Sequence, residues 1–250
     1  FTMWTKKERF EAVLNHELAD RPPVSAWRHF TENEHSGVDL FVETMLKWQN
    51  TYDWDYVKLQ PRASYYEEAW GGQFDYNDYE GVLPKVVKGP IGGVADLEKI
   101  TVLPGDQGVF AEQIEVIQKM KAGLNEDIPM FQTMMCPTSV LQKLCAVNPI
   151  GRYRAASRDD LMMTLMHEQP ELIHKLDTAP QWLDKSITPM GGCDERLFGQ
   201  HKAEEIAALT RNTLKRMKDI PFVLAPDCSL ATNTYDEELR AFIEAAHSND

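Results

Sequence analysis

The sequence lacks the features of a secreted or membrane protein. No apolar run approaches the roughly 20 residues that a membrane-spanning helix needs. The segment Phe1–Arg9 lacks the basic-then-apolar order of a signal peptide. Cysteine is scarce and no pair has C-x-x-C spacing, which suggests a reducing compartment and a cytoplasmic protein. The four cysteines are Cys136, Cys145, Cys193 and Cys228.

Positive charge is also in short supply. The 250 residues include 26 Lys and Arg against 39 Asp and Glu, so the net charge is −13. An acidic surface repels a phosphate backbone, and nucleic acid is therefore not expected as a partner. The sequence contains no G-x-G-x-x-G, P-loop or G-x-S-x-G motif, and its histidines show no H-x-H or H-E-x-x-H spacing.

What is present is the pattern of one α/β domain covering residues 1–250. Apolar residues make up 43% of the chain, enough to form a full core. Strands alternate with helices, which predicts a parallel sheet in either a TIM barrel or a doubly wound fold. The expected strands cover 24–30, 55–59, 129–134, 188–193 and 222–225. After a first helix that opens at a capping box, Thr5–Glu8, the expected helices cover 37–50, 111–122, 139–147, 158–167, 170–185, 202–217 and 236–247. The stretch 61–104, rich in Gly, Tyr and Pro, is expected to form loops or a hairpin.

The chain is short of strands for a closed barrel. The helix 170–185 leads directly into a strand, without a Gly or Asn to close it. About five strands are expected, whereas a TIM (β/α)8 barrel has eight. Strand–helix units are therefore expected to be missing from the chain around Ser186–Ile187.

The first candidate site follows the turn at Pro22 and Pro23. The next strand carries Arg28 and His29 near its C-terminal end, where parallel α/β folds hold their active sites. An arginine there can bind a carboxylate or phosphate through two parallel hydrogen bonds. A surface arginine stacked on Trp27 accounts equally well for the pattern.

The second candidate is Cys228, in the turn after the strand 222–225. A thiolate at this position can bind zinc or act as a nucleophile. Most free cysteines are instead small buried hydrophobes, and one cysteine without a visible partner is a weak indication of a metal. Cys193, at the end of another strand, is expected to pack in the core.

Five segments, in this order, resemble the uroporphyrinogen decarboxylase superfamily. They are Glu8-Arg9-Phe10 through Asp20-Arg21-Pro22-Pro23-Val24, Cys136-Pro137-Thr138 through Leu144, Pro170-Glu171-Leu172, Gly191-Gly192-Cys193-Asp194-Glu195-Arg196, and Phe222 through Cys228 followed by Thr234 and Glu238. The resemblance runs over nearly the whole chain and implies a (β/α)8 barrel with its pocket at the C-terminal face of the strands. Family members carry further strand–helix units between the third and fourth segments, in agreement with the missing units.

This superfamily contains two chemistries. One branch decarboxylates the acetate arms of uroporphyrinogen without a cofactor, and its members usually show R-Q-A-G-R after the first strand and an aspartate after the second. Here Arg28 is followed by His29-Phe30-Thr31, and Pro61 stands in place of the aspartate. The other branch moves methyl groups between a corrinoid and a thiol, and binds zinc through a His-x-Cys pair and a later cysteine. Cys228 lies where that later cysteine is expected.

The resemblance therefore implies a zinc-dependent methyltransferase acting between a corrinoid, or a similar donor, and a thiol. Cys228 would be a zinc ligand, and its His-x-Cys partners would lie in the missing units. The substrate-binding residues implied are Arg28, His29, Gln60, Arg62 and Tyr65. The partners implied are a small-molecule substrate, a corrinoid-carrying protein and a second copy of the chain in a homodimer. The alternatives are a cofactor-free uroporphyrinogen decarboxylase and a barrel that binds a ligand without catalysis.

Overall fold

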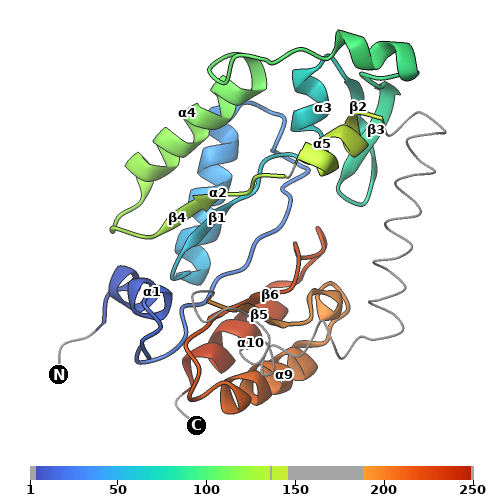
Figure 1. Ribbon diagram of the computed structural model, residues 1–250. Coiled ribbons are helices and arrows are strands. Elements are labelled where there is room, and N and C mark those ends of the chain that lie inside the picture. Colours follow the sequence, from blue (N-terminus) through green and yellow to red (C-terminus); the bar gives the residue numbers. More distant parts are fainter. Residues whose placement is uncertain (1–3, 136, 146–187, 249–250) are drawn as a thin grey trace.

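A computed structural model describes residues 4–135, 137–145 and 188–248 (Figure 1). The expected helices 158–167 and 170–185, and the junction at Ser186–Ile187, lie outside these ranges. In the described part of the chain, no helix is long and apolar enough to cross a membrane. The elements are those of a mixed α/β protein, as the sequence predicts.

Parallel strands form the centre of the molecule. Strand β1 (Val57–Leu59) pairs with β4 (Met130–Gln132), and β5 (Met190–Cys193) pairs with β6 (Val223–Pro226), in both cases in parallel. The segment 23–28 lies between the two pairs. Val24 forms a parallel bridge with Leu224, and its carbonyl accepts a 2.9 Å hydrogen bond from the Asp55 amide. The spatial order is therefore β5, β6, segment 23–28, β1 and β4.

These strands form an open arc, and no closed barrel is present in the described part of the chain. The sequence predicts a barrel fold with about five strands and with strand–helix units missing. The strand expected at 24–30 is also reduced to two isolated bridges, at Val24 and Arg28. One physical reason is that Pro22 and Pro23, which lead into it, have no N–H groups with which to extend the ladder.

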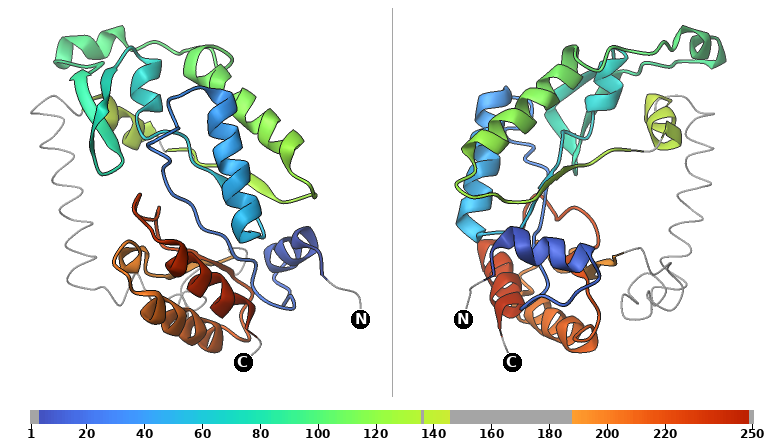
Figure 2. Two further views of the ribbon diagram at one scale, coloured as in Figure 1. Left: turned by 180° about the vertical axis from the view of Figure 1, so that it is seen from behind. Right: turned by 60° about the vertical axis from the view of Figure 1, so that its left-hand side comes forward.

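Helices cover the outer side of the arc in two groups (Figures 1 and 2). Helices α2 (Val38–Tyr52) and α4 (Gly108–Gly123) pack over β1 and β4, where Met45, Leu59 and Met120 share one core cluster. Helices α9 (Ala203–Arg216) and α10 (Asp236–His247) pack over β5 and β6.

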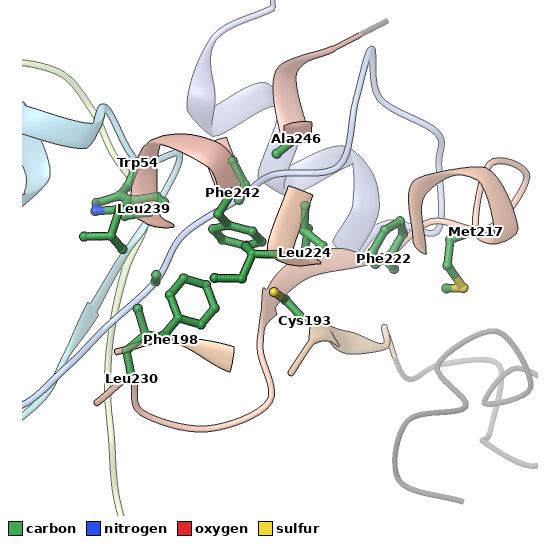
Figure 3. Packing of buried hydrophobic residues seen from close by; sticks show 13 residues of the cluster. Trp54, Cys193, Phe198, Met217, Phe222, Leu224, Leu230, Leu239, Phe242 and Ala246 are labelled. Atoms are coloured by element: carbon green, nitrogen blue, oxygen red, sulfur yellow. The ribbon is translucent and has the colours of Figure 1, made fainter. Parts of the chain in front are cut away.

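The second outer cluster is drawn from segments far apart in the sequence (Figure 3). It brings Trp54 and Leu224 together with Phe242 of α10, and Cys193 lies within it, fully buried. The expected packing role of Cys193 is confirmed. Burial raises the pKa of its thiol to about 12, so this sulfur stays protonated near neutral pH.

Helix α1 (Lys6–Leu14) covers the N-terminal end of the strands. It begins at the expected capping box, with reciprocal hydrogen bonds between Thr5 and Glu8. Its Phe10 ring stacks 5.2 Å from that of Tyr56, which in turn lies 5.4 Å from Phe131. The interior of the arc is therefore closed by aromatic packing at this end.

The remaining elements lie beyond the C-terminal ends of β1 and β4. The stretch 61–104 forms the expected hairpin, β2 (Gln73–Glu80) and β3 (Leu83–Lys88). It also contains two short helices, α3 (Tyr65–Ala69) and the 3-10 helix η1 (Val94–Lys99). Helix α5 (Pro137–Leu144), which follows β4, lies at the same end. The short 3-10 helix η3 (Glu195–Leu197) follows β5. The hairpin contacts the loop after segment 23–28, because the rings of Tyr76 and His35 stack 4.7 Å apart.

Candidate functional site

The inner face of the arc is set by alternation along β1. Val57 and Leu59 belong to the outer core cluster. Side chains alternate between the two faces of a strand, so Tyr56, Lys58 and Gln60 point to the inner face. Tyr56 lies in the aromatic packing at the N-terminal end, which leaves Lys58 and Gln60 nearer the C-terminal edge. This edge is the one that holds the active site in parallel α/β barrels.

A chain of buried polar side chains crosses this edge. The Nδ1 of His29 lies 3.2 Å from Glu34 Oε2, and its Nε2 lies 3.1 Å from Gln60 Nε2. The hydroxyl of Thr133, just beyond β4, donates to the Leu59 carbonyl at 3.1 Å. It also lies 3.3 Å from Gln60 Oε1. The segment 23–28, β1 and β4 are thereby tied together at their C-terminal ends.

The contacts of the His29 ring indicate which of its nitrogens donates and which accepts a hydrogen bond. A carboxylate accepts only, so Nδ1 carries the proton that is donated to Glu34. The Nε2 then accepts from the amide of Gln60 in this arrangement. His29 and Gln60, both predicted from the sequence as site residues, are therefore brought into direct contact.

Two buried polar atoms at this end have no hydrogen-bond partner among the residues that the structure describes. They are Oε1 of Glu34 and Nε1 of Trp27. Glu34 is 3% exposed and Trp27 is 7% exposed. Leaving a buried polar group unpaired costs about 1–3 kcal/mol, so such groups mark sites where a missing partner would bind.

Lys58 supplies positive charge to the inner face. Its Nζ lies 3.9 Å from the centroid of the Trp27 ring, within range of a cation–π contact. Burial lowers the pKa of Lys58 to about 8, and the nearby Cys228 acts in the opposite direction. At neutral pH the side chain is therefore still mostly an ammonium.

Cys228 lies in the turn after β6 and is exposed. No group of three or more His, Cys, Asp or Glu side chains able to hold a metal occurs within the described ranges. Cys228 supplies one potential zinc ligand, and the described residues alone do not fit a zinc site.

Arg28 is held by partners other than the side chains of His29, Gln60 and Lys58. Its guanidinium stacks 4.6 Å from the ring of Phe30. It donates to Glu32 at 2.8 Å and to the Thr232 carbonyl at 2.9 Å. Arg28 therefore joins segment 23–28 to the loop after β6, and its charge is already paired.

Arg62 and Tyr65 form a second cluster, between β1 and the helices α3 and α4. The guanidinium of Arg62 donates to both oxygens of Glu68, at 2.7–2.9 Å, and to both oxygens of Glu112, at 2.6 and 3.0 Å. Tyr65 is buried, with its ring 4.1 Å from that of Tyr66. The predicted pocket residues are thus divided into two groups, with His29 and Gln60 in one and Arg62 and Tyr65 in the other.

The sequence interpretation omitted three residues of the inner-face site. Lys58 could have been found, because alternation places it on the same face as Gln60. Thr133 could have been found as the residue that follows the expected strand at β4. Glu34 had no comparable signal, since it reaches His29 from an irregular loop.

Comparison with known proteins identifies the fold. No model of a known protein family matches the chain, and no curated protein matches it. Among solved structures, it is similar to a methyltransferase from Methanosarcina mazei, with a TM-score of 0.65 and 17% sequence identity. The similarity covers 98% of each chain. At this identity, the two proteins share a fold.

Proposed function

We propose that this chain is a zinc-dependent methyltransferase of the uroporphyrinogen decarboxylase superfamily, moving a methyl group between a corrinoid, or a similar donor, and a thiol. The observation that carries the proposal is the position of Cys228, an exposed cysteine in the turn that follows β6, at the C-terminal end of a parallel strand. The fold shared with a methyltransferase adds support. It would not be sufficient by itself, because one fold can host many chemistries.

In this proposal Cys228 is one zinc ligand, and the others are a His-x-Cys pair in the strand–helix units expected to be missing around Ser186–Ile187. Bound zinc would hold a thiol as a nucleophilic thiolate. The chain His29–Gln60–Thr133 would keep the edge of the pocket rigid. Arg28 and Arg62 could bind an anionic substrate only by leaving Glu32, or Glu68 and Glu112.

The same proposal includes the surroundings of the enzyme. The methyl donor would be carried by a small corrinoid protein that docks at the C-terminal edge of the strands. We further propose a cytoplasmic location, because few cysteines, none with C-x-x-C spacing, suit a reducing compartment. A homodimer is part of the same proposal.

The direct test is elemental analysis of zinc in the full chain and in the variants Cys228→Ser and Cys145→Ser. About one zinc per chain is expected in the parent and in Cys145→Ser, and none in Cys228→Ser. Cys145 is the matched control because it is only partly exposed and lies in another part of the fold. Absence of zinc from the parent, even after metal is supplied, would remove the zinc mechanism.

The alternatives have their own readouts. Turnover of uroporphyrinogen by the metal-free parent would favour the decarboxylase. Neither activity, together with binding of a small ligand, would favour a barrel that does not catalyse a reaction.

A further inference from the structure

The two arginines predicted among the substrate-binding residues, Arg28 and Arg62, are both committed to protein partners. Arg62 makes paired hydrogen bonds to two carboxylates and its side chain is 12% exposed. Arg28 is held by Glu32 and by the carbonyl of Thr232. Releasing either guanidinium would break charge-assisted hydrogen bonds, which are about twice as strong as neutral ones.

Lys58 differs from both arginines. It makes no ion pair and no hydrogen bond with any described residue, and its contact is with the face of the Trp27 ring. Burial disfavours its charged form, and a bound anion would restore the favourable environment that the ammonium has lost. The buried carboxylate of Glu34, at the same edge, contacts His29 and makes no ion pair with Lys58.

The surroundings of Lys58 also suit a bound oxyanion. Gln60 lies above it on the same face, towards the C-terminal edge, with His29 in contact. Trp27 presents an indole N–H that is buried and unpartnered among the described residues. An ammonium and an indole N–H are both donors, so this part of the inner face offers hydrogen bonds to an anion. Among the described residues, no carboxylate forms an ion pair with Lys58.

We infer that Lys58 is the oxyanion-binding residue of this site, where its ammonium and the indole N–H of Trp27 receive a carboxylate or phosphate group of the substrate. Lys58 of β1 thereby takes the anion-binding role that the sequence analysis considered for Arg28. The inference deepens the proposed function and rests on it only in identifying the anion as part of the methyl-transfer substrate.

Trp27 offers a readout that does not depend on catalysis. The full chain would be labelled with 15N at the tryptophan indoles, and the Trp27 signal assigned by its loss in Trp27→Phe. Sodium acetate and inorganic phosphate would then be titrated separately at constant ionic strength. A saturable shift of the Trp27 indole signal is expected with at least one probe, and the comparison of the two distinguishes carboxylate from phosphate.

Variants make the assignment specific. Lys58→Met should weaken the apparent affinity about tenfold or more, because a hydrogen bond to a charged group is lost. Lys58→Arg should retain the anion-induced shift of the Trp27 indole signal, because it keeps a positive charge at this position. Retention would show that the charge, and not the lysine side chain as such, is needed for binding. Lys85→Met is the matched control, since Lys85 is exposed on the hairpin and paired with Asp78.

Three results would overturn the inference. They are no saturable shift in the parent with either anion, an unchanged affinity in Lys58→Met, and a loss of affinity in Arg28→Gln or Arg62→Gln that Lys58→Met does not show. A chain that binds acetate or phosphate through Lys58 but never transfers a methyl group would contradict the proposed function and leave this inference standing.

Discussion

Asp55 and Glu34 are both buried carboxylates, but they lie at opposite ends of the same strands. Asp55, at the N-terminal end, is fully buried and accepts hydrogen bonds on both oxygens. Its donors are Arg9 at 2.8 Å, the Val24 amide at 2.8 Å, and Arg21. Glu34, at the C-terminal end, has one contact to His29, and its other oxygen is unpartnered within the described residues.

This difference separates stability from function along the strands. At the N-terminal end, Arg9 also pairs with Asp20, so two arginines and two aspartates neutralise each other. At the C-terminal end, the charge of Lys58 and the second oxygen of Glu34 are left for a ligand. Proteins commonly keep such groups unpaired at the cost of stability where function needs them. In parallel barrels, features of the N-terminal face serve stability and those of the C-terminal face serve catalysis.

The largest effect is expected from removing Asp55. Asp55→Ala leaves Arg21 and part of Arg9 buried without a counter-charge, which should lower the free energy of unfolding by about 3–5 kcal/mol. Urea denaturation measures the change. Asp78→Ala, which removes the exposed Lys85–Asp78 pair, is the control and should cost less than about 1 kcal/mol. Equal losses in the two variants would show that the Asp55 cluster is not a stability device.

A smaller effect on stability is expected from Glu34→Gln. The amide oxygen can still accept from His29, and an uncharged amide is easier to bury than a carboxylate. The free energy of unfolding should change by no more than about 1 kcal/mol, while the rate of methyl transfer falls. Paired urea and activity measurements test this. A loss of stability as large as that of Asp55→Ala, with activity retained, would break the comparison.

The smallest effect depends on pH and concerns Glu67, another buried carboxylate with an unpartnered oxygen in the described structure. Burial raises its pKa above the ordinary 4.5, although Lys143 opposes the shift. Between those two pKa values the folded state binds more protons, so stability falls as pH rises through that window. Glu67→Gln removes this dependence. It should be slightly more stable than the parent at pH 7, and the difference should vanish below about pH 4.

Unfolding midpoints measured across this pH range would decide the matter. Lys143→Met gives a second check, because loss of the lysine charge should raise the pKa of Glu67 further. The stability of this variant should then fall more between low pH and pH 7 than that of the parent. A Glu67→Gln profile parallel to that of the parent would contradict the assignment of this carboxyl group.

Much of the fold could be predicted from the sequence because it depends on local signals. The capping box at Thr5–Glu8 does begin a helix, and the apolar periodicity in 236–247 matches helix α10 at both ends. Four of the five expected strands lie within a few residues of β1, β4, β5 and β6, as alternation allows, whereas 24–30 forms only isolated bridges. The described strands form an open arc, because the closure of a sheet depends on contacts between distant segments.

The site could be predicted only in part, for the same reason. Placement at strand ends correctly brought His29 and Gln60 together. The pairing of Arg62 with Glu112 could not be foreseen, because 50 residues separate them. Sequence position alone therefore could not show that the charge of Arg62 is already neutralised. Among the described residues of this edge, the unpaired positive charge belongs to Lys58, and only the alternation of side chains along β1 points to that residue.

The central claim is that the C-terminal edge of these strands transfers methyl groups. The most direct measurement is demethylation of methylcobalamin by the zinc-supplied full chain in the presence of a small thiol, followed by the absorbance of the corrinoid and by mass spectrometry of the methylated thiol. The account predicts thiol-dependent turnover in the parent and none in Cys228→Ser. The account would be contradicted if the zinc-loaded parent demethylates methylcobalamin with none of several thiols, while the metal-free protein consumes uroporphyrinogen.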